Sequence, residues 1–288
     1  MTVNKSLIAV LLMTAGLGAC GGGGSVSFNT SPPPAGPSEG LWQGSTSSAR
    51  TITTFVLDNG VFWILYSGSG PNPGTGIAGL IQGSGTSING SFSSADAKDV
   101  NLEGQGIGAA TVSASYVAKT SFNGTIFYPN LNQTVSFASN YNIAYEQAPS
   151  VATLAGSYTG IASTAGATDA AIVRIDASGN LNGIGTSGCQ FAGTASPHAR
   201  GNLYDLSITF KGGACSNGSN TLTGIAYYDA AARRLYNVAL NSERSSGFIY
   251  VGLKLMRRAD PAPLLSHSAV QMRRTGWLPR KVYCHQYI

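Results

Sequence analysis

The sequence predicts an all-β protein with two antiparallel β-barrels, or barrel-like sandwiches, repeated in tandem. Charged residues make up 10% of the 288 residues, and glycines number 38. Soluble domains usually carry about 25% charged residues. Apolar and polar side chains alternate along much of residues 40–252, and the order of strand-like segments recurs after about 100 residues. The alternative is a single larger barrel formed by both halves.

The composition suits short strands joined by tight turns. Tyrosine occurs 13 times in a chain rich in glycine. Aromatic residues favour strands, whereas glycine favours turns. A hydrophobic content of 43% argues against disorder for most of the chain. Residues 40–252 show no amphipathic helical pattern.

Period-two alternation marks individual strands. Residues 204–210, YDLSITF, alternate as expected for a half-buried strand. Residues 134–145, TVSFASNYNIAY, are also predicted as strand, with an apolar face formed by Val135, Phe137, Tyr141, Ile143 and Tyr145. The pair Asn59-Gly60 between two apolar runs predicts a hairpin turn.

Two glycine-flanked aromatic segments begin the recurring units. GLWQG (40–44) and GSYTG (156–160) each precede a strand-like segment and then a turn. Later segments are paired as follows: 90–94 with 191–196, and 121–128 with 221–228. The paired glycines would let backbones approach closely, and the aromatic residue between them would close one end of each barrel.

The N-terminus has the pattern of a bacterial lipoprotein signal. Lys5 precedes an apolar run at residues 6–17, which is too short to span a bilayer as a stable helix. The segment LGAC, residues 17–20, resembles the lipobox, in which cleavage precedes the cysteine and its sulfur receives a lipid. The resemblance implies a palmitate-type anchor on Cys20. An ordinary secretory signal is the alternative.

The residues after Cys20 predict a flexible tether and a destination. Residues 20–39 are rich in glycine, serine and proline, which keeps such segments flexible or locally extended. Residue 21 is glycine, and by resemblance to enteric lipoproteins the lack of aspartate there favours the outer membrane. The predicted organisation is a signal peptide (1–19), the tether (20–39), repeat 1 (40–148), repeat 2 (149–254) and a basic, disordered tail (255–288).

Two family resemblances agree with this layout. GLW at residues 40–42 resembles the opening of lipocalins and other calycin barrels, in which the tryptophan closes the base. The order of lipobox, tether and barrel-type domains resembles the two-lobed surface lipoproteins of Gram-negative bacteria, such as transferrin-binding protein B and factor H-binding protein. The resemblance implies a binding protein that faces the cell surface or the periplasm. It does not identify the ligand.

The cysteines divide by position. Cys189 and Cys215 lie on stretches that neighbouring strands would bring together, so a disulfide is expected in an exported protein. Two buried thiols are the alternative. Cys284 is left over in the tail.

The sequence offers little catalytic chemistry. The histidines are His198, in a predicted solvated loop, and His267 and His285, in the tail. No Gly-x-Ser-x-Gly elbow is found between a strand and a helix. Asp96 and Asp99, with Glu103 nearby, come closest to a metal-binding cluster, but we interpret them as solvated turn acids. We therefore predict a protein that is not an enzyme and needs no metal or cofactor.

Net charge argues against nucleic-acid binding. Residues 253–288 hold seven basic residues and one acid, a net charge of +6, whereas the other 252 residues have a net charge of −1. The predicted barrels therefore have no basic field to attract nucleic acid. The tail is interpreted as a disordered extension, with a basic arm for anionic lipid as the alternative.

Aromatic residues support a binding role. Trp42, Trp63 and Tyr158 are candidate ligand contacts, although such residues more often pack cores. The sequence thus predicts a lipid-anchored outer-membrane module that binds a protein, a glycan or a small ligand. A structural or assembly factor of the envelope is the alternative.

Overall fold

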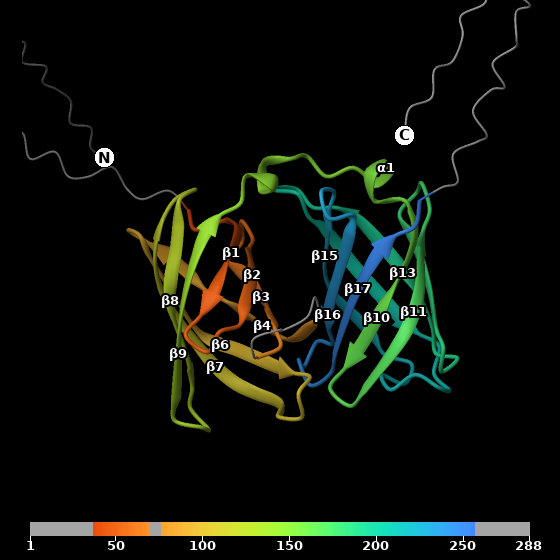
Figure 1. The fold of residues 1–288 in the computed structure, drawn as a ribbon, viewed down its shortest axis with the longest axis horizontal. Coiled ribbons are helices and arrows are strands. Elements are labelled where there is room, and N and C mark those ends of the chain that lie inside the picture. Colours follow the sequence, from red (N-terminus) through yellow and green to blue (C-terminus); the bar gives the residue numbers. More distant parts are fainter. Residues whose placement is uncertain (1–36, 70–75, 257–288) are drawn as a thin grey trace, which may run out of the picture.

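The computed structural model describes residues 37–69 and 76–256, which form two closed antiparallel β-barrels side by side (Figure 1). The strands of barrel 1 are β1 (Gly40–Thr46), β2 (Thr51–Val56), β3 (Val61–Ser67), β4 (Ile77–Ser84), β6 (Ser91–Asn101), β7 (Gly106–Val117), β8 (Ser121–Tyr128) and β9 (Gln133–Tyr141). They pair in this order, and β9 returns to β1. The short β5 (Thr86–Ile88) pairs with β6.

Barrel 2 also has eight strands. They are β10 (Gly156–Thr164), β11 (Ala167–Ile175), β12 (Asn180–Gly185), β13 (Gln190–Pro197), β14 (Tyr204–Phe210), β15 (Thr221–Asp229), β16 (Arg234–Leu240) and β17 (Gly247–Lys254). Neighbours in sequence pair, and β17 closes onto β10. The prediction of an all-β fold with two tandem barrels is confirmed, and the alternative of one larger barrel is wrong.

A short helical connection joins the barrels. It contains the 3-10 helix η1 (Ile143–Glu146) and the helix α1 (Val151–Leu154). The strand pattern predicted to run to residue 145 is wrong at its end, because the Asn142 side chain accepts a hydrogen bond from the Ala144 amide and caps η1. No described helix has the length and apolar character needed to cross a membrane.

The pentapeptides form the first strand of each barrel, where that strand meets the last one. A Cβ on Gly44 would clash with the backbone carbonyl of Ala138 in β9. A Cβ on Gly160 would clash with the carbonyl of Val251 in β17. Glycine is thus required at both positions so that the first and last strands can approach and close the barrel.

The aromatic residue of each pentapeptide closes one end of its barrel. The indole N–H of Trp42 donates to the carbonyl oxygen of Ser38 at 3.0 Å, and the hydroxyl of Tyr158 donates to the carbonyl of Leu154. Both side chains are fully buried. In each case the ring reaches back to a carbonyl four residues earlier, so the two barrels use the same closing device.

The pairing of later segments is wrong by one strand. β8 is the seventh strand of barrel 1, whereas β15, with which the sequence paired it, is the sixth of barrel 2. The same shift separates residues 90–94, which enter β6 at Ser91, from residues 191–196, in β13. The cause is β4, a glycine-containing strand that the sequence pattern merged into a hairpin.

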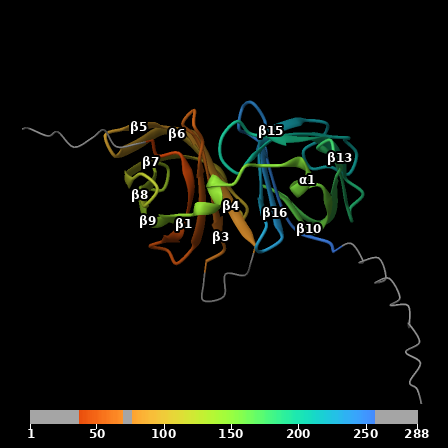
Figure 2. The ribbon, with the colours of Figure 1, turned by 90° about the horizontal axis from the view of Figure 1, so that it is seen from above.

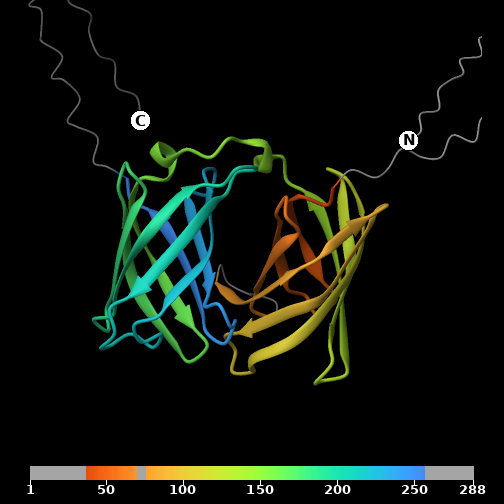
Figure 3. The same ribbon diagram turned by 180° about the vertical axis from the view of Figure 1, so that it is seen from behind.

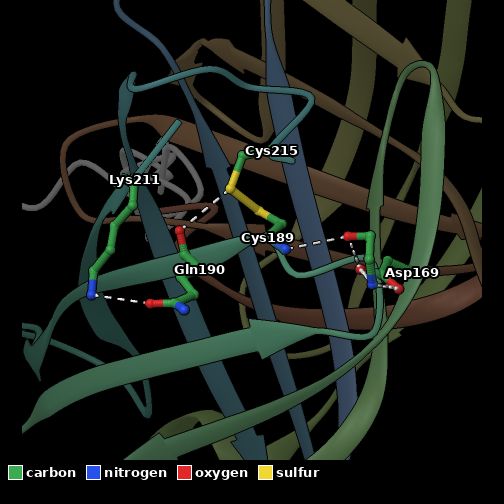
Figure 4. Close-up of a disulfide and its surroundings, with 6 residues drawn as sticks. Asp169, Cys189, Gln190, Lys211 and Cys215 are labelled. Atoms are coloured by element: carbon green, nitrogen blue, oxygen red, sulfur yellow. Dashed lines mark hydrogen bonds between the residues drawn. A yellow bond between two sulfur atoms is a disulfide. The ribbon is translucent and has the colours of Figure 1, made fainter. Parts of the chain in front are cut away.

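Cys189 and Cys215 form a disulfide in barrel 2 (Figure 4). Their Cα atoms lie 4.6 Å apart. Cys189 lies between β12 and β13, while Cys215 lies in the loop at residues 211–220 between β14 and β15. The bond therefore holds this loop against the end of barrel 2 that lies opposite Tyr158.

The barrels pack through their outer walls. The two barrels lie side by side in the ribbon views (Figures 2 and 3). One continuous cluster of buried side chains joins β2 and β3 of barrel 1 to β15, β16 and β17 of barrel 2. Phe55 and Tyr227 meet across it, with ring centroids 5.2 Å apart. Polar contacts border the cluster, since Arg244 of barrel 2 pairs with Asp96 of barrel 1.

His198 also lies at the edge of the contact between the two barrels. It lies in a loop, as predicted, but it is not solvated, because its side chain is only 12% exposed. Its Nδ1 is 2.7 Å from Asp205, and its Nε2 is 3.5 Å from Asp58 of the other barrel. The histidine thus hydrogen-bonds to Asp205 of its own barrel and lies next to Asp58 of the other barrel.

Candidate functional site

A cavity of about 500 Å³ opens at the end of barrel 1 opposite Trp42. Its walls include an aliphatic belt of Ile52, Ile64, Ile81 and Ile126. Turns and strand ends at residues 46–50, 99–109 and 128–135 form its mouth. In Figure 1 this is the lower end of the left-hand barrel, where the β6–β7 and β8–β9 hairpins turn. The cavity therefore has an apolar wall and an open, polar rim.

The closed end of barrel 1 is aromatic. Trp42 stacks on Phe122 with ring centroids 5.5 Å apart, and Phe122 meets Phe92 and Phe137 at 5.4 and 5.7 Å. All four side chains are buried. This packing leaves the other end of the barrel as the entrance.

The corresponding end of barrel 2 is packed with aromatic side chains. Phe191, Phe210 and Phe248 pack together there with centroids 5.3–5.5 Å apart. The disulfide-tethered Cys215 joins the same core cluster. The two barrels share a fold but differ in the side chains that occupy this end.

Asp99 lies inside barrel 1 because β6 contains a bulge. Before the bulge Phe92 and Ser94 are buried, and after it Ala97 and Asp99 are buried. At this point β6 has one residue more than the β7 segment that it faces, so the inward positions change from even to odd numbers. The interpretation of Asp99 as a solvated turn acid is therefore wrong.

Two tyrosines surround the Asp99 carboxyl. Tyr66 donates its hydroxyl to Asp99 Oδ1 at 2.7 Å, and the Tyr128 hydroxyl lies close enough to favour the ionised carboxyl as well. Burial raises the pKa of Asp99 to about 6, even though both hydroxyls favour its ionised form. Burial, together with the negative charge of Asp99, raises the pKa of both tyrosines, so they remain neutral donors.

A glycine in the neighbouring strand β4 lets the Tyr66 ring lie over that strand. Gly79 in β4 is the register partner of Tyr66 in β3, and a Cβ on it would clash with the Tyr66 ring and hydroxyl. The ring therefore crosses β4 at Gly79 and reaches Asp99 and Asn101 in β6, and Asn101 donates to its hydroxyl at 3.2 Å.

Arg50 lies at the mouth of the cavity, and its positive charge is paired with Glu103. Its Nη2 lies 2.6 Å from Glu103, and its Nη1 donates to the carbonyl oxygen of Ser67 at 2.7 Å. The guanidinium also lies 5.3 Å from the centre of the Tyr66 ring. The hydrogen bond that Arg50 donates to Glu103 raises the pKa of Arg50, so the ion pair persists at neutral pH.

The candidate ligand contacts named from the sequence are not in the cavity. Trp42 and Tyr158 close barrel ends, and Trp63 is buried between the barrels. The tyrosines that line the cavity are Tyr66 and Tyr128. Nothing in the single sequence indicated that Asp99 faces the barrel interior, because no residue marks the bulge.

The three acidic residues near residue 100 do not form a cluster. Asp96 pairs with Arg244, Glu103 pairs with Arg50, and Asp99 lies inside the barrel. In the part of the chain that the structure describes, no three His, Cys, Asp or Glu residues form a metal-binding group. Cys20, Cys284, His267 and His285 lie outside the described residues.

Comparisons with known proteins add little. No protein-family model matches the chain, and no curated protein shows significant similarity to it. Among solved structures, the chain resembles a Bacteroides fragilis protein provisionally described as an outer membrane protein. The two are 12% identical, the match covers 76% of this chain and 97% of the other, and the TM-score is 0.24. A likeness of this size carries no argument about function.

Proposed function

We propose that this protein is a lipid-anchored binding module whose barrel 1 holds a small ligand. The observation that carries the proposal is the cavity of about 500 Å³, which joins an aliphatic wall to the buried Asp99 and two tyrosine hydroxyls. Ligand sites are typically apolar pockets with a few converging polar groups. The filled barrel 2 would serve as a rigid support for barrel 1.

Binding is favoured over catalysis by the groups around the cavity. Asp99 is hydrogen-bonded to Tyr66, whose hydroxyl stays neutral because its pKa is raised, rather than to a histidine. The histidine that the structure describes, His198, is engaged by acids between the barrels. Catalysis by a nucleophile and base needs these groups within hydrogen-bond reach of each other.

The proposed anchor is a lipid on Cys20 that holds the barrels at the outer membrane. The lipobox-like segment at residues 17–20 and Gly21 support this assignment. We expect Cys20→Ser to release the protein from the membrane fraction and to remove the mass of the acyl groups, as measured by fractionation and intact-mass spectrometry. A variant that stays membrane-bound with the mass of the wild type would contradict the anchor.

An envelope assembly factor is the alternative, and one feature favours it. Apolar side chains lie exposed on neighbouring strands of barrel 2, namely Ile161, Ile172, Ile184 and Leu253. Ile172 pairs directly with Ile184 across β11 and β12. Exposed apolar residues grouped in this way are typical of contact surfaces.

Filling the cavity tests the binding proposal. Gly108 lines the cavity and is the register partner of Asp99, and a Cβ at this position would meet no atom within 4 Å. Gly108→Phe should therefore occupy the cavity without a backbone clash. We expect the affinity of the purified full-length protein for the neutral fluorophore N-phenyl-1-naphthylamine to fall by about tenfold or more, since the loss of these contacts costs over about 1.4 kcal/mol.

Gly166→Phe is the matched control. Gly166 lies in the hairpin between β10 and β11 of barrel 2, and a Cβ there would also meet no atom within 4 Å. This variant should bind the fluorophore as the wild type does. Equal affinity in wild type and Gly108→Phe would show that the cavity is not the binding site.

A further inference from the structure

We propose that the ligand of barrel 1 is a small amphipathic amine, with its ammonium group on Asp99 and its apolar part against the isoleucine belt. The inference rests on the proposed binding function and deepens it by giving the chemical class of the ligand. It is drawn from the balance of charge in the cavity, the partners of Asp99 and the shape of the wall.

Asp99 is a buried carboxyl whose hydrogen bonds come from neutral groups. It is 7% exposed, it accepts a hydrogen bond from the Tyr66 hydroxyl, and the nearby Tyr128 hydroxyl also favours its ionised form. A buried carboxylate is stable only when charge or strong donors compensate for lost hydration. Two hydroxyls supply part of this compensation, and an ammonium group would supply the rest.

The positive charge of Arg50 lowers the pKa of Asp99, but burial outweighs this effect and keeps the pKa raised. Arg50 forms its ion pair with Glu103 and donates to the carbonyl of Ser67. With Arg50 matched by Glu103, Asp99 is the negative charge left over in the cavity wall. A ligand with an anionic head would meet this charge, whereas an ammonium group would pair with it.

The remaining surroundings suit an amine with an apolar body. Aromatic faces attract cations, and the position of Arg50 over the Tyr66 ring shows that this ring already does so. Elsewhere on the cavity wall, Ile64, Ile81 and Ile126 offer apolar surface without charge. The cavity thus combines an acidic and aromatic part with an aliphatic part.

The groups that face Asp99 come from several elements, and they determine the pH dependence. Tyr66 comes from β3, Tyr128 from β8, Arg50 from the β1–β2 turn and Glu103 from the β6–β7 turn. The tyrosines stay neutral and Arg50 stays charged near neutral pH. Asp99 is therefore the group whose protonation should weaken amine binding as the pH falls through about 6.

Three probes of equal chain length test the inference. Heptylamine, heptanol and heptanoate would each compete with N-phenyl-1-naphthylamine for the full-length protein at about pH 7.5, where Asp99 is ionised. We expect heptylamine to displace the fluorophore at concentrations about tenfold lower than heptanol, and heptanoate to be the weakest competitor. The advantage of the amine should disappear at about pH 4.5, because Asp99 is then protonated while the amine stays charged.

Asp99→Asn should raise the heptylamine concentration needed for displacement by about tenfold or more and leave that of heptanol unchanged. Asp96→Asn is the matched control, because Asp96 belongs to the same strand but faces Arg244 outside the barrel. Equal displacement by all three probes, or a preference for heptanoate, would overturn the inference and leave the binding function standing. A fluorophore that fails to bind would instead refute the binding function.

Discussion

Trp42→Ala should lower the free energy of unfolding by about 3–5 kcal/mol, as is typical when a large buried aromatic side chain is removed. The indole is fully buried, stacks on Phe122, and meets Tyr141 at 5.2 Å in an edge-on arrangement. Its removal leaves a void at the closed end of barrel 1 and frees the carbonyl of Ser38. Urea unfolding followed by circular dichroism measures the change, and the melting temperature should fall by about 10 °C.

Trp42→Phe separates packing from hydrogen bonding. It keeps an aromatic ring but loses the N–H donor, so we expect a loss of about 1–2 kcal/mol. In barrel 2, Tyr158→Phe removes only the hydroxyl that bonds to Leu154, and we expect about 1 kcal/mol. A Trp42→Ala variant within about 1 kcal/mol of the wild type would refute the role of this residue as the closure of barrel 1.

The Asp99→Asn variant should be more stable than the wild type at about pH 8. This difference in the free energy of unfolding should vanish at about pH 4. The pKa of Asp99 is raised from 3.8 to about 6, so the folded state binds the proton more tightly than the unfolded state does. Protonation therefore favours folding, and ionisation above about pH 6 costs stability. Each pKa unit corresponds to about 1.4 kcal/mol, so about 3 kcal/mol is the upper limit of the gain from a neutral amide.

The measurement is the difference in unfolding free energy between variant and wild type across this pH range. Comparing the two proteins removes the contribution of other titrating groups. Asp96→Asn should give a difference that changes little, because the Asp96 side chain is 59% exposed. If Asp99→Asn destabilises the protein more at pH 8 than at pH 4, Asp99 is paired with a cation and the charge argument fails.

The sequence predicted the barrels because their signals are local. Alternation, turn residues and the glycines of the two pentapeptides each act within a few residues, and the structure uses them as expected at Gly44 and Gly160. The placement of Cys189 and Cys215 on neighbouring stretches also suggested their disulfide. The predicted resemblance to two-lobed lipoproteins holds at the level of two β-barrels in tandem.

The candidate site was not predictable because it depends on register. One additional residue in β6 exchanges the inward and outward faces, so Asp99 enters the barrel and Asp96 leaves it. Trp63 was a candidate ligand contact, but β3 is covered on both faces, and its outer face meets barrel 2. The packing between the barrels depends on parts of the chain that are distant in sequence. The same is true of which side chains point inward after a bulge.

The central claim is that the cavity of barrel 1 receives the ligand, and methyl NMR of the full-length protein tests it most directly. During titration with heptylamine, we expect the methyl signals of Ile64, Ile81 and Ile126 to shift, because these residues line the cavity. The signals of Ile175 and Ile208, which belong to the filled core of barrel 2, should stay in place. Shifts confined to barrel 2, or to exposed isoleucines such as Ile172 and Ile184, would contradict the claim.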